Sequence, residues 1–97
     1  MAVTKTNETR SRIDLQLARI GSELERAMEL HAPMNSPHEA YAVILEEVDE
    51  FWEDVKINPK KLDGHEQAKR KAHMQMELLQ IAAMCIRATI DCDLMGG

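Results

Sequence analysis

Apolar residues recur at steps of three and four in three stretches of this chain, which is the spacing of amphipathic helices. The first stretch runs from Arg10 to about His31 and carries its apolar seam on Ile13, Leu17, Ile20, Leu24 and Ala27 or Met28. It should end ahead of Pro33, because a proline disfavours helical geometry at the residue before it. Residues 1–9 are polar, and we expect them to be frayed.

A second helix is predicted to start at Ser36-Pro37-His38-Glu39. Serine at the cap, proline at the first helical position and glutamate three residues after the cap form a capping box. The broad apolar face of this helix comprises Tyr41, Ile44, Leu45, Val48, Phe51, Trp52 and Val55. The pairs Asn58-Pro59 and Asp63-Gly64 then predict a short connection.

A third helix is predicted from about His65 to about Asp91. Between Leu78 and Ile86 its only polar side chain is Gln80, so we expect this portion to be buried on nearly all sides. A polar column nevertheless follows the helix, with Met84 as its one apolar member: Glu66, Arg70, His73, Glu77, Gln80, Arg87 and Asp91. Burying Glu77 or Gln80 without partners would cost about 1–3 kcal/mol, so we expect both to bind something.

These elements predict an all-α fold in which three main helices form an antiparallel bundle. The composition agrees, since 44% of the residues are hydrophobic but only 3% are aromatic, and prolines are few. A chain of 97 residues is one domain near the lower size limit for a self-sufficient core. We therefore expect self-association to complete the bundle.

Net charge and cysteine content narrow the classes of partner. A formal charge of −5 argues against a nucleic acid polymer, because phosphate binding needs a basic face. The sequence shows neither a signal peptide nor a membrane span, which predicts a cytoplasmic protein without a membrane partner. Cys85 and Cys92 are seven residues apart on one predicted helix, too far to bridge each other. We expect reduced thiols, with an intersubunit disulfide as the alternative.

Six carboxylates occupy nine residues, Glu46 to Asp54, with no basic residue among them. Like charges three or four positions apart on a helix cost roughly 0.2–0.5 kcal/mol per pair, so a multivalent cation or basic side chains must offset the repulsion. At 100° per residue, one flank of the apolar seam carries Glu47, Glu50 and Asp54. The same projection places Asp49 and Glu53 toward solvent, and Glu46 almost opposite the seam.

Two acidic pairs at i, i+3 spacing could meet between the second and third helices. Glu47 and Glu50 form one pair, and Glu77 and Gln80 form the other. Helices joined by a short loop usually pack antiparallel, which would bring three carboxylates and an amide oxygen together. This all-oxygen set suits Mg²⁺, or Mn²⁺, rather than zinc. A di-iron site is discounted, because no Glu-x-x-His pair occurs.

Several further residues have both a structural and a functional interpretation. His73, one turn before Glu77, is either structural or part of the same site. The lysines of the connection form either a solvated loop or a cationic rim for phosphates: Lys56, Lys60 and Lys61. The aromatic residues either belong to the core or stack on a base: Tyr41, Phe51 and Trp52.

The pattern Glu46-Glu47-Val-Asp-Glu50, a 26-residue spacer and Glu77-Leu-Leu-Gln80 resembles the EExxE…ExxD signature of the MazG-like, all-α nucleotide pyrophosphohydrolases. The resemblance covers residues 37–93. It implies a single MazG-like domain, 1–97, that forms a homodimer or homotetramer. It also implies hydrolysis of a nucleoside triphosphate, ribo- or deoxy-, to the monophosphate and pyrophosphate.

The same resemblance assigns roles to individual residues. By position, Glu47, Glu50 and Glu77 would be Mg²⁺ ligands, and Glu46 would support the site or position water. Candidate substrate-binding residues are Lys56, Lys60, Lys61, Arg70, His73 and Trp52.

Gln80 stands where the family has an aspartate. Its amide oxygen can ligate a hard cation but brings no charge, so metal binding should be weaker. This leaves a working variant enzyme, a non-catalytic nucleotide- or metal-binding relative, and a purely structural helical oligomer as alternatives.

Overall fold

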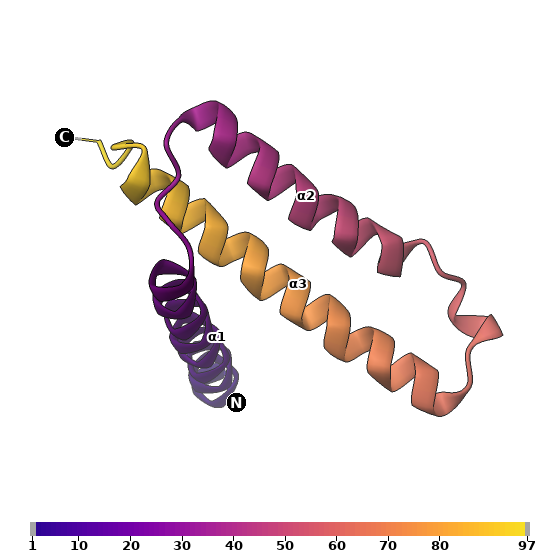
Figure 1. Ribbon diagram of the computed structural model, residues 1–97. Helices are drawn as coiled ribbons and strands as arrows, with labels where there is room; N and C mark the ends of the chain where they lie inside the picture. The colour runs from indigo at the N-terminus through magenta and orange to yellow at the C-terminus, as the bar shows by residue number, and fades with distance from the viewer. Residues whose placement is uncertain (1, 97) are drawn as a thin grey trace.

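Three long helices and two short connections make up the computed structural model of this chain (Figure 1). The structure describes residues 2–96, with side chains from residue 6 onward. The elements are α1 (Ala2–Leu30), α2 (Pro37–Val55), a short 3₁₀ helix η1 (Pro59–Lys61) and α3 (Gly64–Asp91). Within these described residues there is no strand, and the predicted all-α fold is confirmed.

Helix α1 is longer than the sequence pattern indicated. It begins at Ala2, so residues 2–9 are helical in this structure and their fraying stays a prediction, while Met1 lies outside the described residues. An apolar seam indicates where a helix packs against other residues, but it does not indicate where the helix starts. Residues 2–9 contain no glycine or proline, so nothing in their sequence prevents the helix from continuing to Ala2. The helix ends at Leu30, ahead of Pro33, as predicted.

Helix α2 starts at the predicted cap. Ser36 Oγ accepts a hydrogen bond from the Glu39 backbone N–H at 3.1 Å. The Glu39 carboxylate, in turn, accepts from the Asn35 N–H at 3.0 Å, one residue before the cap, instead of from Ser36 itself. Both carboxylate and hydroxyl thus satisfy backbone donors that the helix start would otherwise leave unpaired.

A complete capping box starts α3. Asp63 Oδ1 accepts from the Glu66 N–H at 2.7 Å, and Glu66 Oε1 accepts from the Asp63 N–H at 3.2 Å. The Gln67 amide donates to the carbonyls of Pro59 and Leu62, at 2.9 and 3.0 Å, and so fastens the connection to the first turn of α3. These bonds place α3 back beside α2.

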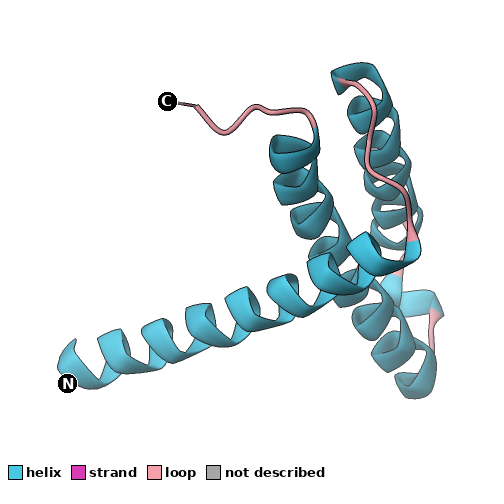
Figure 2. Ribbon diagram, turned by 60° about the vertical axis from the view of Figure 1, so that its left-hand side comes forward, coloured by secondary structure: helices cyan, strands magenta, loops and turns pink. Residues whose placement is uncertain are grey.

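Helices α2 and α3 lie side by side and antiparallel, as predicted, whereas α1 crosses α3 at a wide angle (Figures 1 and 2). Figure 2 shows the N-terminal part of α1 extending away from the other two helices. Residues 2–15 of this part are termed the projecting half. Along residues 2–96, no helix is both long and apolar enough to cross a membrane.

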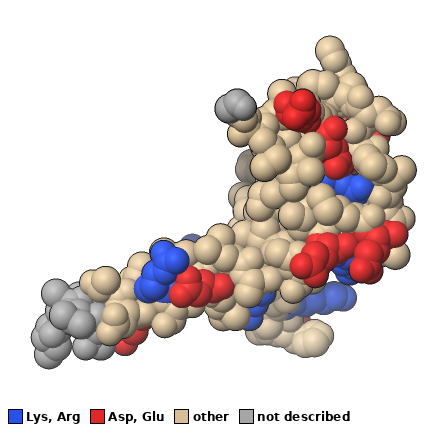
Figure 3. Space-filling model, turned by 90° about the vertical axis from the view of Figure 1, so that its left-hand side faces the viewer, with Lys and Arg blue, Asp and Glu red and all other residues tan. Residues whose placement is uncertain are grey.

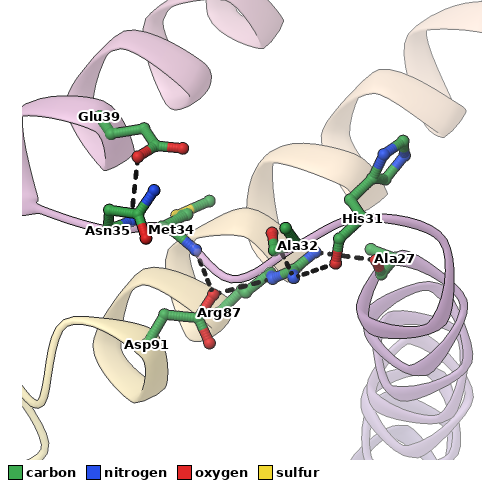
Figure 4. Close-up of polar contacts among 8 residues, drawn as sticks. All are labelled: Ala27, His31, Ala32, Met34, Asn35, Glu39, Arg87 and Asp91. Carbon is green, nitrogen blue, oxygen red and sulfur yellow. Dashed lines mark hydrogen bonds and ion pairs between the residues drawn. The ribbon is translucent and has the colours of Figure 1, made fainter.

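Arg87 fastens α1 to α3 (Figure 4). Its side chain is buried, and its guanidinium donates to the carbonyl oxygens of Ala27, His31 and Ala32 at 2.8, 2.7 and 2.9 Å. The His31 and Ala32 carbonyls lie just after the last turn of α1, where no intrahelical donor is available, while the Ala27 carbonyl also accepts from the His31 N–H at 3.0 Å. Arg87 therefore caps the C-terminus of α1 from a neighbouring helix.

Asp91 completes this contact. Its Oδ2 atom accepts from Arg87 Nε and from the Met34 backbone N–H, both at 2.9 Å (Figure 4). The ion pair is almost fully buried and each partner has further hydrogen bonds, which is the arrangement in which a buried pair is tolerated. The two residues hold α1, the connection and α3 together.

The buried core of the single chain is small. Its buried apolar side chains are Ala27, Met34, Ala40, Ala83 and Ala88. Leu78 is 50% exposed and Ile86 is also exposed, so the prediction that this part of α3 is buried on nearly all sides is wrong for one chain. Only α1 and α2 pack on α3, and they leave one side of it uncovered.

Only one edge of the apolar face of α2, which carries Ile44 and Phe51, is partly buried in the single chain. Helix α3 packs against the flank that carries Glu47 and Phe51, while Tyr41 and Trp52 are exposed. The interpretation of Tyr41 and Trp52 as core residues is therefore wrong for one chain. Periodicity predicted which residues share a face of α2, but it did not predict which face meets α3.

Candidate metal centre

Three glutamates from two helices meet between α2 and α3. Glu47 and Glu50 lie one turn apart on α2, and Glu77 faces them from α3. One carboxylate oxygen from each lies within 4.8 Å of the other two. The predicted convergence of these three side chains is confirmed, and their role as metal ligands stays a prediction.

Burial makes this cluster unusual among surface acids. Glu77 is only 4% exposed, and Glu47 is half-buried. The Oε2 atoms of Glu47 and Glu77 are both buried and have no hydrogen-bond partner among the described residues. A buried carboxylate oxygen without a donor is costly, so a proton or a cation is needed there.

The pKa values of Glu47 and Glu50 are raised by desolvation and by this clustering of carboxylates. Partial burial, the contact with Glu77 and the charges of its acidic neighbours together raise the pKa of Glu47 to about 7. Desolvation and the nearby charge of Glu77 also raise the pKa of Glu50. At neutral pH Glu47 is thus partly protonated, and a bound divalent cation would displace that proton.

His73 links the cluster to the end of α2. Its Nδ1 atom is hydrogen-bonded to the Asp54 carboxylate, and its Nε2 atom lies 3.4 Å from Glu77 Oε1. The hydrogen bond and the charge of Asp54 raise the pKa of His73. The predicted approach of His73 to Glu77 is confirmed. Asp54 contacts the histidine and is not one of the three clustered carboxylates.

These shifts predict how stability depends on pH without metal. Glutamates of the unfolded chain titrate near 4.5, so raised pKa values mean that the folded state loses stability as pH rises through about 7. His73 acts in the same direction, because stability from its raised pKa is complete below about 6.5 and is lost as pH rises through the folded value.

In EDTA we therefore expect the melting temperature to fall between about pH 5 and pH 8, and Mg²⁺ to oppose this fall increasingly as the pH rises. Thermal melts at a series of pH values measure both effects. Glu47→Gln should flatten the slope in EDTA. A melting temperature that rises with pH over this interval would show that the three glutamates do not govern stability.

A cavity of about 430 Å³, termed the three-helix cavity, opens on one side of the cluster. All three helices line it, and Glu46, Glu47 and Gln80 lie on its wall together with Met84 and Arg87. Gln80, the expected fourth ligand, lines the same cavity as Glu47, and its role as a ligand stays a prediction. The exposed Glu46 reaches the same wall, whereas the exposed Asp49 does not line it, which agrees with its predicted solvent position.

A second cavity, of about 560 Å³, lies at the other end of the cluster and is termed the end cavity. Its wall includes Asp54, His73, Arg70 and Lys69. Sequence reasoning missed Lys69, although its spacing of four residues from His73 places both on one face of α3.

Part of the Arg70 side chain makes structural hydrogen bonds to the end of α2. Its guanidinium donates to the carbonyl oxygens of Asp54 and Val55 at 2.7 and 3.4 Å, and so caps the end of α2. Lys56 is exposed and pairs with Glu53 at 2.8 Å. Neither this lysine nor the two lysines of η1 line the three-helix cavity or the end cavity.

Trp52 is also remote from both cavities and exposed on another face of α2. Substrate binding by the lysines 56, 60 and 61, by Arg70, by His73 and by Trp52 stays a prediction, and the geometry favours His73 and Arg70 among them.

Comparisons with protein-family models, with curated proteins and with solved structures found no match to this chain. The chemistry that the cluster can perform follows from its own residues. Three carboxylates with two orphaned buried oxygens form a set of hard donors that fits Mg²⁺ or Mn²⁺.

Proposed function

We propose that this chain is a Mg²⁺-dependent hydrolase that cleaves a nucleoside triphosphate to the monophosphate and pyrophosphate. The observation that carries the proposal is the triad Glu47, Glu50 and Glu77 with its orphaned buried oxygens. The order of these glutamates along the chain supports it, because it resembles the signature of the MazG-like pyrophosphohydrolases. Mn²⁺ is an alternative ion for the same donors.

In this proposal the three glutamates hold the ion, which supplies charge screening of the phosphates and activation of water when bound. Asp54 holds the His73 ring, and that ring keeps the Glu77 carboxylate turned toward α2. Glu46, exposed on the wall of the three-helix cavity, accepts a hydrogen bond from the attacking water and orients it.

In this proposal the two cavities orient the bound nucleotide between the three-helix cavity and the end cavity. The three-helix cavity, at about 430 Å³, falls within the size range of small-molecule sites and takes the nucleoside. The end cavity carries the basic side chains Lys69, Arg70 and His73 beside the acids Asp54 and Glu66, and in this proposal its basic side takes the leaving pyrophosphate. The proposal places the chain in the cytoplasm, where nucleoside triphosphates are used and where free thiols such as Cys85 stay reduced.

Gln80 supports a second candidate function. It lines the same cavity as Glu47, so the centre offers three carboxylates where an aspartate at this position would give four. A non-catalytic relative that binds a nucleotide or a metal ion without turnover would have such a weakened centre. Gln80→Asp should then tighten metal binding and create turnover.

A screen of common ribo- and deoxynucleoside triphosphates tests the proposal directly. We expect pyrophosphate release from at least one of them with Mg²⁺ or Mn²⁺, and none with EDTA, because the glutamates alone would repel the phosphates. Absence of release from every nucleotide, with calorimetry showing nucleotide binding, would favour the non-catalytic relative. Absence of both release and binding would leave the structural oligomer.

A further inference from the structure

The single chain leaves too much surface uncovered for a self-sufficient fold. Its accessible surface is 7407 Å², whereas a folded monomer of 11.0 kDa should expose about 5,600 Å². Its radius of gyration is 16.4 Å against about 12.5 Å for a compact domain of this length. The excess, about 1,800 Å², exceeds the roughly 800 Å² that each partner contributes to a standard interface and suits an obligate one.

A continuous apolar stripe on α2 forms part of this excess. Its residues follow one another at steps of four and three, the spacing of a coiled-coil seam, and each is 38–69% exposed: Tyr41, Leu45, Val48, Trp52 and Val55. We term this set the α2 stripe. Since α3 packs against another flank of α2, nothing in the described chain covers the stripe.

A second apolar surface lies where α1 crosses α3. A groove of about 460 Å³, termed the α1–α3 groove, is lined mainly by apolar atoms of Gln16, Ile20, Lys71, Met74, Gln75, Leu78 and Leu79. Leu17, next to it on α1, is exposed, as is Leu78 on its wall. The groove can therefore receive large apolar side chains from another molecule.

Charge decides how the two surfaces can pair. Helix α2 holds seven acidic residues and no lysine or arginine, so its formal charge is −7. Since the net charge of the whole chain is −5, the remainder of the chain carries +2. Two α2 stripes packed on each other would bring these acids together. The groove instead offers Lys71 on its wall, and Arg12 and Arg19 lie on the same face of α1 as Gln16. Figure 3 shows basic side chains on the extended part of α1, with acidic side chains beside them.

We propose that a second copy of this chain covers both surfaces, with the α2 stripe of each copy packed into the α1–α3 groove of the other. A two-fold axis makes the two contacts equivalent, so the dimer contains the same interface twice. Acidic flanks of α2 then face the basic rim of the groove. This pairing does not depend on the metal centre or on nucleotide hydrolysis.

Reciprocal pairing has a distinctive consequence for mixtures of variants. Val48→Glu places a charge in the α2 stripe, and Leu78→Glu places a charge in the α1–α3 groove. Both residues are exposed in the single chain, at 40% and 50%, so the chain itself buries neither charge. Light scattering after size exclusion should show a dimer for the unaltered chain and a monomer for each variant alone. A 1:1 mixture should regain dimers, because one of the two interfaces in the mixed dimer is intact.

Leu94→Glu is the matched control, since Leu94 is an apolar residue that is 60% exposed but belongs to neither surface, and this variant should remain dimeric. Circular dichroism must show unchanged helicity, with Trp52→Glu as a substitute if Val48→Glu unfolds. The proposal is overturned if the unaltered chain is monomeric at about 100 µM, if Leu78→Glu stays dimeric, if the mixture stays monomeric, or if Leu94→Glu dissociates as well.

Discussion

Exchanging Glu77 for glutamine is expected to remove metal-dependent turnover and to raise the melting temperature of the metal-free chain. Turnover should fall by at least about 100-fold, the usual loss when a buried electrostatic group at a reaction centre is removed. Stability should rise because Glu77 is 4% exposed and the amide of a glutamine can donate to the orphaned oxygen of Glu47. Pyrophosphate release and thermal melts in EDTA measure the two effects.

Asp49→Asn is the matched control for this experiment. Asp49 is an acid of α2 that is exposed and lies outside the three-glutamate cluster. Its loss should leave turnover and the stabilisation by Mg²⁺ within a factor of about two of the unaltered chain, since exposed sites away from special contacts have small effects. Equal losses in the two variants would mean that general acidity, and not the cluster, supports the reaction.

Arg87→Met is expected to cause the largest loss of stability in the chain. The substitution removes the Arg87 donors from the carbonyl oxygens of His31 and Ala32, leaves that of Ala27 with only the His31 N–H, and leaves the Asp91 carboxylate buried without its ion-pair partner. Removing one member of a buried pair costs about 3–5 kcal/mol. For a domain of this size the melting temperature should fall by about 12 °C or more, measured at matched protein concentration.

Arg10→Ala provides the comparison for Arg87. Arg10 also pairs with an aspartate four residues away, at 3.1 Å from Asp14, but both side chains are exposed. Its loss should change stability by less than about 0.5 kcal/mol. Arg87→Lys should lie between the two, because an ammonium cannot span three carbonyls and a carboxylate as a guanidinium does. A melting temperature of Arg87→Met close to that of Arg10→Ala would refute the capping role.

The helices themselves were predictable because their signals are local. Ser36 before Pro37 starts α2, Pro33 requires α1 to end before it, and apolar periodicity marks all three helices. The start of α3 was predicted one residue late, although Asp63 and Glu66 carry the sequence of a capping box. That signal was present and was interpreted only as a turn.

Tertiary contacts were predictable only where chemistry constrained them. Glu77 was expected to meet Glu47 because a buried acid needs a partner and a short connection makes α2 and α3 antiparallel. What covers the broad apolar face of α2 was not predictable, since such a face satisfies periodicity whether it is covered by the same chain or by another. Arg87 was recognised as polar on α3, yet its partners are backbone carbonyls, which carry no sequence signal.

The projecting half of α1 has a consequence for the ordering of the chain. Its residues extend beyond α3, and an isolated helical segment of about 12–15 residues is only marginally stable in water. Tertiary packing must therefore come from outside the chain if this segment is to stay helical. The α1–α3 groove is lined on α1 by Gln16 and Ile20, so a partner that fills it leaves the projecting half without new packing, and the amide protons of this segment should exchange faster than those of the rest of α1 in monomer and dimer alike.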